Sequence, residues 1–135
     1  MIPLIPIRRQ LIQNAVFIPE KNLYLKSTHV HDCVIEVLDD GREVMIDGGL
    51  EYVRRSVHPA ERVIDLCLYD DSPFEAIAEG LLWGTYGKGG NQPLRYRPIS
   101  TLELDHLIAI RDTQFHISAR IRQVVEYWIA HKSIL

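Results

Sequence analysis

The chain has 135 residues, within the usual size of a single domain and enough to bury a hydrophobic core. Apolar residues make up 47% and charged residues 24%, as in average globular proteins and unlike disordered chains. The formal net charge of −3 argues against general DNA or RNA binding, because nucleic-acid phosphates need a broad basic face. We therefore expect one folded domain over residues 1–135, without a DNA or RNA partner.

The N-terminus and the cysteines bear on the cellular compartment. Residues 1–9 are apolar, but two prolines interrupt them and the basic pair follows the apolar run, so they match neither a signal peptide nor a membrane span. Cys33 and Cys67 are too few for a disulfide framework and too far apart for a zinc knuckle. We expect reduced thiols in a cytoplasm and no membrane partner.

The first half of the chain has the pattern of an antiparallel sheet. Over residues 14–56, short apolar and β-branched runs alternate with turn residues at intervals of about ten residues. The runs 33–38 and 43–46 flank Asp40-Gly41, whose glycine supplies the positive φ of a hairpin turn. Residues 63–69 form a further predicted strand.

The second half has the apolar spacing of helices, with a period of about 3.6 residues. The first predicted helix begins with Ser72-Pro73 and ends near residue 84. A capping-box pattern at Ser100 and Glu103 opens a second helix, and Ser118 caps a third. The last two helices are expected to form an antiparallel pair packed on the sheet. The predicted fold class is α+β, an N-terminal antiparallel sheet followed by about three helices.

A glycine-rich loop and a basic strand follow the first predicted helix. Glycines at 84, 87, 89 and 90 let backbone N–H groups approach an anion, and Lys88 adds a charge, although the spacing is not that of a Walker motif. In the strand-like run 94–97 the side chains alternate, so Arg95 and Arg97 share a face and can bind a pyrophosphate. Trp83 and Tyr86 can offer a stacking surface for a base. The alternatives are a flexible connector, a Trp83 in the core and solvated arginines.

The run His29-Val30-His31-Asp32 raises the possibility of a metal site. In a strand, His29 and His31 would point to one face, but Asp32 would point to the other. A metal site needs three or four converging ligands, so we predict structural histidines, no metal and no other cofactor. Because no catalytic arrangement stands out, we predict no catalytic residue and no enzyme activity.

Residues 29–32, 47–56 and 83–96 together resemble a widespread family of small bacteriophage and prophage proteins, and the likeness runs over residues 12–131. Within that family the chain is similar to the anti-Thoeris sponges, which bind cyclic ADP-ribose isomers made by bacterial immune sensors. The resemblance implies an antiparallel sheet followed by helices and assembly as dimers or larger homo-oligomers. It also implies capture of a cyclic nucleotide signal without cleavage, in the cytoplasm of an infected bacterial host. Some members hold cyclic di- or trinucleotides at a second site.

The resemblance also assigns residues. Asn91 matches the asparagine that contacts the nucleotide, and Leu81 stands where an aromatic residue stacks on the base, so Trp83 or Tyr86 would have to supply the stacking. Arg55 and Arg111 are the nearest matches for the arginines of the second site. The predicted ligand-binding residues are Leu81, Trp83, Tyr86, Gly87, Lys88, Gly89, Asn91, Arg95 and Arg97.

Three functions follow from these observations, and the first is favoured. It is a non-catalytic sponge, whose affinity has to exceed that of the immune effector. The second is a phosphodiesterase that destroys a cyclic nucleotide, with His29 and His31 as metal ligands or acid-base groups. The third is a protein-binding module that inhibits a host factor through the sheet or the last helix.

Overall fold

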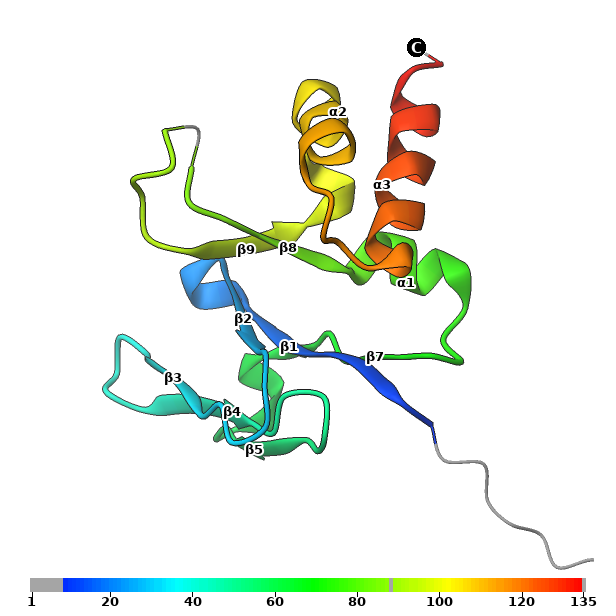
Figure 1. Cartoon of the computed structure of the whole chain (residues 1–135). Coiled ribbons are helices and arrows are strands. Elements are labelled where there is room, and N and C mark those ends of the chain that lie inside the picture. Colours follow the sequence, from blue (N-terminus) through cyan, green and yellow to red (C-terminus); the bar gives the residue numbers. More distant parts are fainter. Residues whose placement is uncertain (1–8, 88, 135) are drawn as a thin grey trace, which may run out of the picture.

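The computed structural model describes residues 9–87 and 89–134, so the predicted binding residue Lys88 lies outside them. Within these residues two antiparallel sheets are followed and partly interleaved by helices (Figure 1). The strands are β1 Leu11–Ile18, β2 Leu23–Ser27, β3 Val34–Val37, β4 Glu43–Asp47, β5 Arg54–Ser56, β6 Ile64–Asp65, β7 Leu68–Tyr69, β8 Leu82–Thr85 and β9 Arg95–Pro98. The helices are α1 Phe74–Gly80, α2 Leu104–Thr113 and α3 Ala119–Lys132, with short 3-10 helices at Pro19–Lys21, Ala60–Arg62 and Ile99–Thr101. The predicted α+β fold class is confirmed.

The larger sheet has the strand order β6-β1-β2-β9-β8, and β7 also pairs with β1. Strand β2 pairs along its whole length with residues 14–18 of β1, whereas β9 joins β2 through the single pair Tyr24 and Tyr96. Strand β8 pairs with β9 from Leu82 opposite Pro98 to Thr85 opposite Arg95. These two strands therefore form a hairpin that projects from the body of the sheet (Figure 1).

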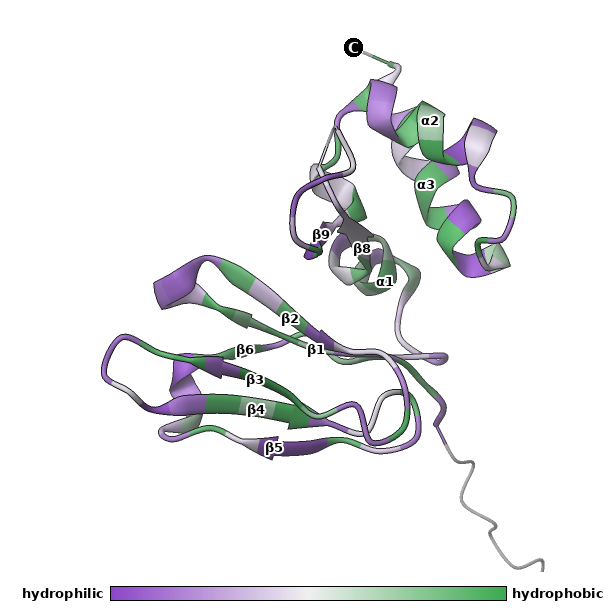
Figure 2. Ribbon diagram, turned by 60° about the vertical axis from the view of Figure 1, so that its left-hand side comes forward, coloured by the Kyte–Doolittle hydropathy of each residue, from purple (hydrophilic) through white to green (hydrophobic). Residues whose placement is uncertain are grey.

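The smaller sheet has the order β3-β4-β5, and the hairpin predicted around Asp40-Gly41 is confirmed by the pairing of β3 with β4. This sheet lies against β1 and β2, with hydrophobic positions along the facing strands (Figure 2). Its packing buries one hydrophobic core, made of Val16, Ile18, Leu25, Leu38, Val44 and Ile46.

The helices enclose a second hydrophobic core. Helices α2 and α3 pack together, and Ser118 caps α3 as predicted by accepting a hydrogen bond from the Ile121 N–H. The Trp128 indole donates to the Ala78 carbonyl of α1 at 2.8 Å. The fully enclosed members of this core are Leu68, Ile77, Ala78, Leu81, Ile99, Leu102, Leu107, Ile110, Val124, Val125 and Trp128. No helix among the described residues has the length and apolar character needed to cross a membrane.

Three details of the second half differ from the prediction. Helix α1 ends at Gly80 rather than near residue 84, because Leu82–Thr85 pairs with β9 and strand pairing outweighs the helical spacing of the apolar residues. The Ser72 hydroxyl accepts from the Tyr69 N–H and does not cap α1. Ser100 likewise lies in a 3-10 helix and makes no capping box, since its hydroxyl donates to the carbonyl of residue 79.

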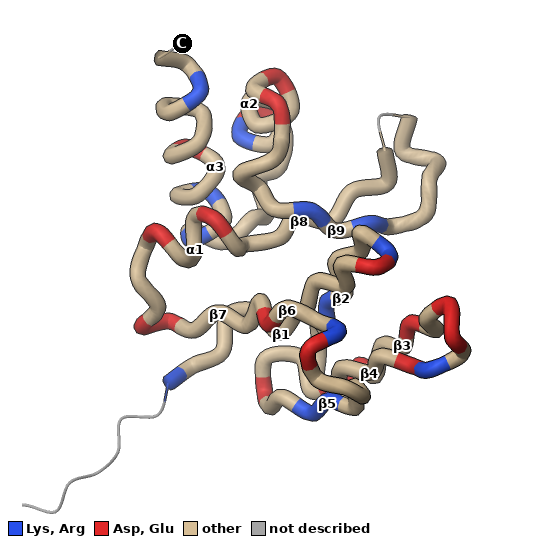
Figure 3. Tube along the Cα trace, turned by 180° about the vertical axis from the view of Figure 1, so that it is seen from behind, with Lys and Arg blue, Asp and Glu red and all other residues tan. Residues whose placement is uncertain are grey.

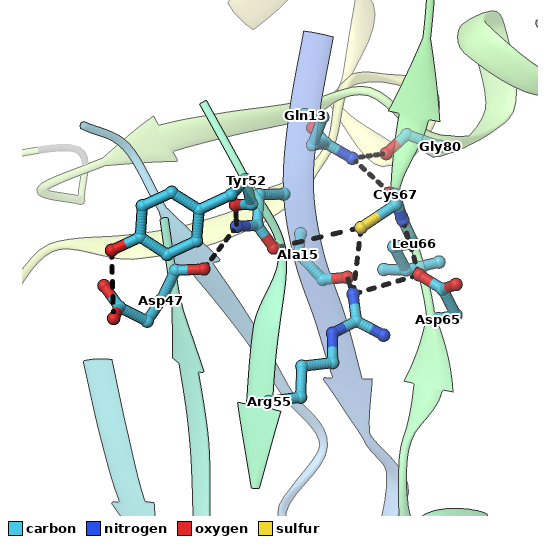
Figure 4. Close-up of polar contacts among 10 residues, drawn as sticks. Gln13, Ala15, Asp47, Tyr52, Arg55, Asp65, Leu66, Cys67 and Gly80 are labelled. Carbon is cyan, nitrogen blue, oxygen red and sulfur yellow. Dashed lines mark hydrogen bonds and ion pairs between the residues drawn. The ribbon is translucent and has the colours of Figure 1, made fainter. Parts of the chain in front are cut away.

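Two buried amides on β1 connect the two halves of the protein. The Gln13 side chain donates to the carbonyls of Leu66 and Gly80, at 3.1 and 2.9 Å (Figure 4). Its oxygen accepts from the Leu82 N–H at 2.8 Å. The Asn14 side chain donates in the other direction, to the carbonyls of residues 47 and 52. Because buried polar groups need partners, these amides fix the start of β8 and the turn after β4 against the same strand.

Candidate functional site

The predicted glycine-rich loop is the turn of the β8–β9 hairpin. Within it, Gln92 donates its backbone N–H to the Tyr86 carbonyl at 2.9 Å, and Gly90 donates to Gly87 at 3.1 Å. Gly87 has a φ of +81°, and a Cβ at this position would lie 2.8 Å from the Gln92 side chain. Glycine is therefore required there by both conformation and space, and the loop is held by its own hydrogen bonds.

Arg95 and Arg97 line one hollow of about 460 Å³, together with their neighbours Tyr96 and Pro98, and we call it the arginine hollow. It follows the seam between β2 and β9, and Figure 3 shows the basic positions of β9 at this place. Its walls contain two arginines, two tyrosines and no carboxylate. They are formed by Asn22, Leu23, Tyr24, Thr85, Arg95, Tyr96, Arg97, Pro98 and Thr101.

The two guanidinium groups of the arginine hollow are held differently. Arg97 donates from Nε to the Thr101 hydroxyl at 3.0 Å, and from a terminal nitrogen to the Thr101 carbonyl. Thr101 in turn donates to the Pro98 carbonyl at 2.7 Å, so it is itself fixed. Arg95 is exposed and makes no hydrogen bond or ion pair within residues 9–87 and 89–134. Arg97 is thus held by the chain itself, whereas the Arg95 side chain has no partner among the described residues.

The aromatic side chains of this hollow come from β2 and β9, and were missed as binding residues by the sequence analysis. Burial raises the pKa of the Tyr96 phenol above its ordinary value, so the group stays neutral and can donate a hydrogen bond. The Lys26 Nζ lies 5.5 Å from the centre of the Tyr96 ring, and burial lowers the pKa of this ammonium. The predicted stacking residues lie elsewhere: Trp83 is half-buried against the helical core, and Tyr86 is 55% exposed in the loop.

A second hollow of about 650 Å³ lies between the hairpin and α2, and we call it the α2 cleft. It shares Thr85 and Arg97 with the arginine hollow, but its other charged groups are acidic. Its walls are formed by Thr85, Gly87, Arg97, Glu103, Asp105, His106 and Ala109. The α2 residues could not be predicted from the sequence, because nothing in their spacing relates them to the glycine-rich loop. They lie beside that loop only because β8 pairs with β9.

A third hollow of about 440 Å³ lies on the other side of Arg95, next to the β3–β4 hairpin. Three carboxylates and one lysine accompany Arg95 there. The walls are Glu20, Lys21, Leu23, Glu36, Asp39, Pro93, Leu94 and Arg95. Excess negative charge repels phosphate, so the arginine hollow is the best of the three for an anion.

Leu81, Gly89 and Asn91 were predicted to bind the ligand but do not line any of these hollows. The Leu81 side chain is 5% exposed and belongs to the helical core, so the structure places it away from the three hollows. Gly89 and Asn91 are exposed in the hairpin turn and line neither the arginine hollow nor the α2 cleft. Of the predicted set, the two hollows bring together Gly87, Arg95 and Arg97.

Arg55 and Arg111, the predicted second site, do not meet within one chain. Arg55 on β5 donates to the Ala15 carbonyl at 3.1 Å, to Asp65 at 3.0 Å and to the Cys67 sulfur at 2.9 Å (Figure 4). Arg111 pairs with the neighbouring aspartate on α2 at 2.9 Å. Strand β5 and helix α2 lie at opposite ends of the molecule (Figure 1). Each arginine therefore has a local partner, and Arg55 serves the interior.

The contacts of Arg55 affect two ionisable neighbours. Burial alone would raise the pKa of the Asp65 carboxyl, but the hydrogen bond from the Cys67 N–H and the Arg55 guanidinium outweigh it, so this pKa lies below its ordinary value. Burial raises the pKa of the Cys67 thiol. The thiol is therefore mainly protonated near neutral pH, and the ion pair of Arg55 is with Asp65.

His29 and His31 lie in a turn between β2 and β3, so the assumption that they occupy a strand is wrong. The cause is close packing against the Asp47-Gly48-Gly49 turn: a Cβ on Gly49 would lie 2.2 Å from the carbonyl carbon of His29. Gly49 also donates its N–H to Ser27 at 2.9 Å. Among residues 9–87 and 89–134, no group of three His, Cys, Asp or Glu side chains is placed to hold a metal ion. That the protein binds no metal stays a prediction.

The two histidines also have different partners. His31, at a φ of +63°, places Nδ1 2.8 Å from the Tyr52 hydroxyl, and that hydroxyl donates to Asp47 at 3.3 Å. Burial, followed by the Asp47 charge, raises the pKa of Tyr52. Nδ1 of His29 lies 3.0 Å from the hydroxyl of residue 28 instead. The first two blocks of the family resemblance thus contact each other and hold two turns together. No protein-family model, no curated protein and no solved structure matches the chain. The geometry and charge of the β8–β9 hairpin are therefore the observations that bear on its function.

Proposed function

We propose that the protein binds a cyclic nucleotide in the arginine hollow without cleaving it. The observation that carries the proposal is the lining of that hollow: Arg95 and Arg97, two tyrosines and no carboxylate, in a chain whose net charge is −3. Guanidinium groups bind phosphate oxygens through paired, charge-assisted hydrogen bonds. Thr101 holds Arg97 in place before the ligand arrives, which lowers the entropy lost on binding.

The ligand class we propose is a cyclic ADP-ribose isomer, held as a sponge holds it, in the cytoplasm of an infected bacterial host. Such a role needs affinity and no chemistry; nanomolar binding, about −12 kcal/mol, is the scale required to compete with an effector. We also propose assembly as a dimer or a multiple of dimers, because a second copy would enclose more of a ligand that lies in a surface hollow.

Calorimetric titration with cyclic ADP-ribose isomers tests the proposal. Arg95→Ala and Arg97→Ala should each weaken binding by about 10- to 100-fold, the effect of losing a hydrogen bond to a charged group. Arg42→Ala is the matched control, because Arg42 is an exposed arginine on the β3–β4 turn, away from the hollow. Equal affinity of all three variants and the parent would exclude the arginine hollow as the site.

Recovery of the ligand separates a sponge from a phosphodiesterase. After binding, heat denaturation of the protein should release the nucleotide intact and in a stoichiometric amount. Linearised product, or turnover with less protein than ligand, would contradict the proposal and favour an enzyme. Light scattering at micromolar protein that detects only a 15.6 kDa species would contradict the proposed oligomer.

A further inference from the structure

We infer that the ligand has two chemically distinct parts and occupies the arginine hollow and the α2 cleft together, with its phosphates at the arginines and a sugar or base in the cleft. This inference rests on the proposed function and specifies the class of ligand. The two hollows are neighbours, since Thr85 and Arg97 line both. A ligand bound to the Arg97 guanidinium is therefore already at the entrance to the α2 cleft.

The charges of the two hollows differ, and this sets the orientation of the ligand. The arginine hollow carries two guanidinium groups and no carboxylate. The walls of the α2 cleft contain two carboxylates, Glu103 and Asp105, and one arginine, Arg97. Carboxylates repel phosphate but accept hydrogen bonds from ribose hydroxyls and from the amino group of a base. The phosphates therefore belong on the β2 side of Arg97, and the donor-rich part on the α2 side.

The side chains on the α2 side are available for such contacts. Glu103 precedes the first turn of α2 but makes no side-chain capping hydrogen bond. His106 adds an imidazole, which can donate or accept beside a sugar or a ring nitrogen. Thr85 contributes a hydroxyl on the shared wall. The cleft thus offers acceptors to hydroxyl and amino groups, in a space within the usual range of small-molecule sites.

The volumes indicate a ligand larger than a mononucleotide. The hollows measure about 460 and 650 Å³, and each alone falls in the range of roughly 300–1,000 Å³ that is typical of a small-molecule site. A mononucleotide would leave one of them to solvent. A ligand with a diphosphate and a nucleoside part can fill both, with the diphosphate in the arginine hollow and the nucleoside in the α2 cleft.

Fragments of the ligand test this arrangement by NMR titration. Inorganic pyrophosphate should bind weakly, and Arg95→Ala should abolish its binding while Glu103→Gln leaves it unchanged or strengthens it. Adenosine should show the reverse sensitivity. Because the two fragments occupy different hollows, saturating pyrophosphate should not displace adenosine. Competition between them would contradict the two-part arrangement, since it would place both fragments in one hollow.

The intact cyclic ADP-ribose isomer provides the second measurement. Glu103→Gln should weaken it about tenfold, whereas Glu43→Gln, an exposed glutamate of the smaller sheet, should leave its affinity unchanged. If only Arg95→Ala weakens binding, the ligand lies in the arginine hollow alone; the inference is then wrong and the proposed function stands. If no nucleotide binds, or if none of these variants changes the affinity, both are wrong.

Discussion

Strands β5 and β9 each carry a pair of arginines, and the protein uses the two pairs in opposite ways. On β5, Arg55 points into the protein and meets a carbonyl, a carboxylate and a thiol. On β9, Arg95 finds no acceptor among the described residues, and Arg97 meets only Thr101. A terminal nitrogen of the largely enclosed Arg55 meets three acceptors of the fold, although its buried Nε has none, whereas the Arg95 guanidinium is exposed to solvent. The acceptors supplied by neighbouring strands therefore decide which arginine is structural.

The largest loss in the free energy of unfolding is expected at Trp128, a residue of the helical core that belongs to neither arginine pair. Trp128→Ala removes a buried indole and its hydrogen bond to the Ala78 carbonyl, and should lower the free energy of unfolding by about 3–5 kcal/mol. Urea denaturation followed by circular dichroism measures this loss. A loss below about 1 kcal/mol would mean that the helices contribute little to the stability of the fold.

Arg55→Ala tests the structural half of the comparison. It leaves the Asp65 carboxylate and the Ala15 carbonyl without this donor, so we expect a loss of about 1–3 kcal/mol in the free energy of unfolding and no change in ligand affinity. The matched variant is Arg95→Ala, because the Arg95 side chain is exposed and makes no ion pair among the described residues. Unchanged stability together with lost binding of a cyclic oligonucleotide would instead make Arg55 a ligand residue.

The pH dependence of stability probes the same arginine through Asp65. Because the folded-state pKa of Asp65 lies below its ordinary value, its contribution to stability is present above the unfolded pKa of about 3.9 and is lost as the pH falls through the folded value. Asp65→Asn should therefore lower the melting temperature at pH 7, by an amount that shrinks toward zero in strong acid. In the Arg55→Ala background the difference at pH 7 should be smaller. A difference independent of pH would contradict an ionic role.

The smallest changes in stability are expected in the β8–β9 hairpin. Arg95→Ala and Asn91→Ala change exposed side chains of the hairpin, so the free energy of unfolding should move by no more than about 0.5 kcal/mol. The two should differ in binding: Arg95→Ala weakens it, while Asn91, which lines neither hollow, should change the affinity less than about threefold. Thermal melts beside calorimetric titration measure both. Strong loss of binding in Asn91→Ala would mean that Asn91 contacts the nucleotide, as the family resemblance implies.

The parts of the fold that follow from local signals were predictable. The Asp40-Gly41 hairpin and the Ser118 cap are fixed by residues adjacent in sequence, and the strand that carries Arg95 and Arg97 was predicted from the alternation of its side chains. The end of α1 was not predictable, because the pairing of Leu82 with β9 overrides a helical apolar pattern. Nor was the turn at residues 28–33, which depends on packing against Gly49.

Some residues of the candidate site could likewise be predicted from the sequence, and others could not. Gly87 and the two β9 arginines are close in sequence and could be named together. Tyr24 and His106 come from β2 and α2, and only the tertiary fold brings them beside the hairpin. The distinction between Arg55 and Arg95 likewise depends on acceptors that lie elsewhere in the chain, such as Asp65 and Ala15 for Arg55.

The adjacent amides Gln13 and Asn14 have a thermodynamic consequence. Gln13 accepts from the N–H of Leu82, at the start of β8, and Asn14 donates to the carbonyl of Asp47, at the end of β4. The β8–β9 hairpin and the smaller sheet are therefore both fixed to strand β1. A ligand that binds only the folded state stabilises whatever unfolds together with its site. A ligand bound in the arginine hollow should therefore slow hydrogen exchange at the amides of β3 and β4 as well, although neither strand lines that hollow.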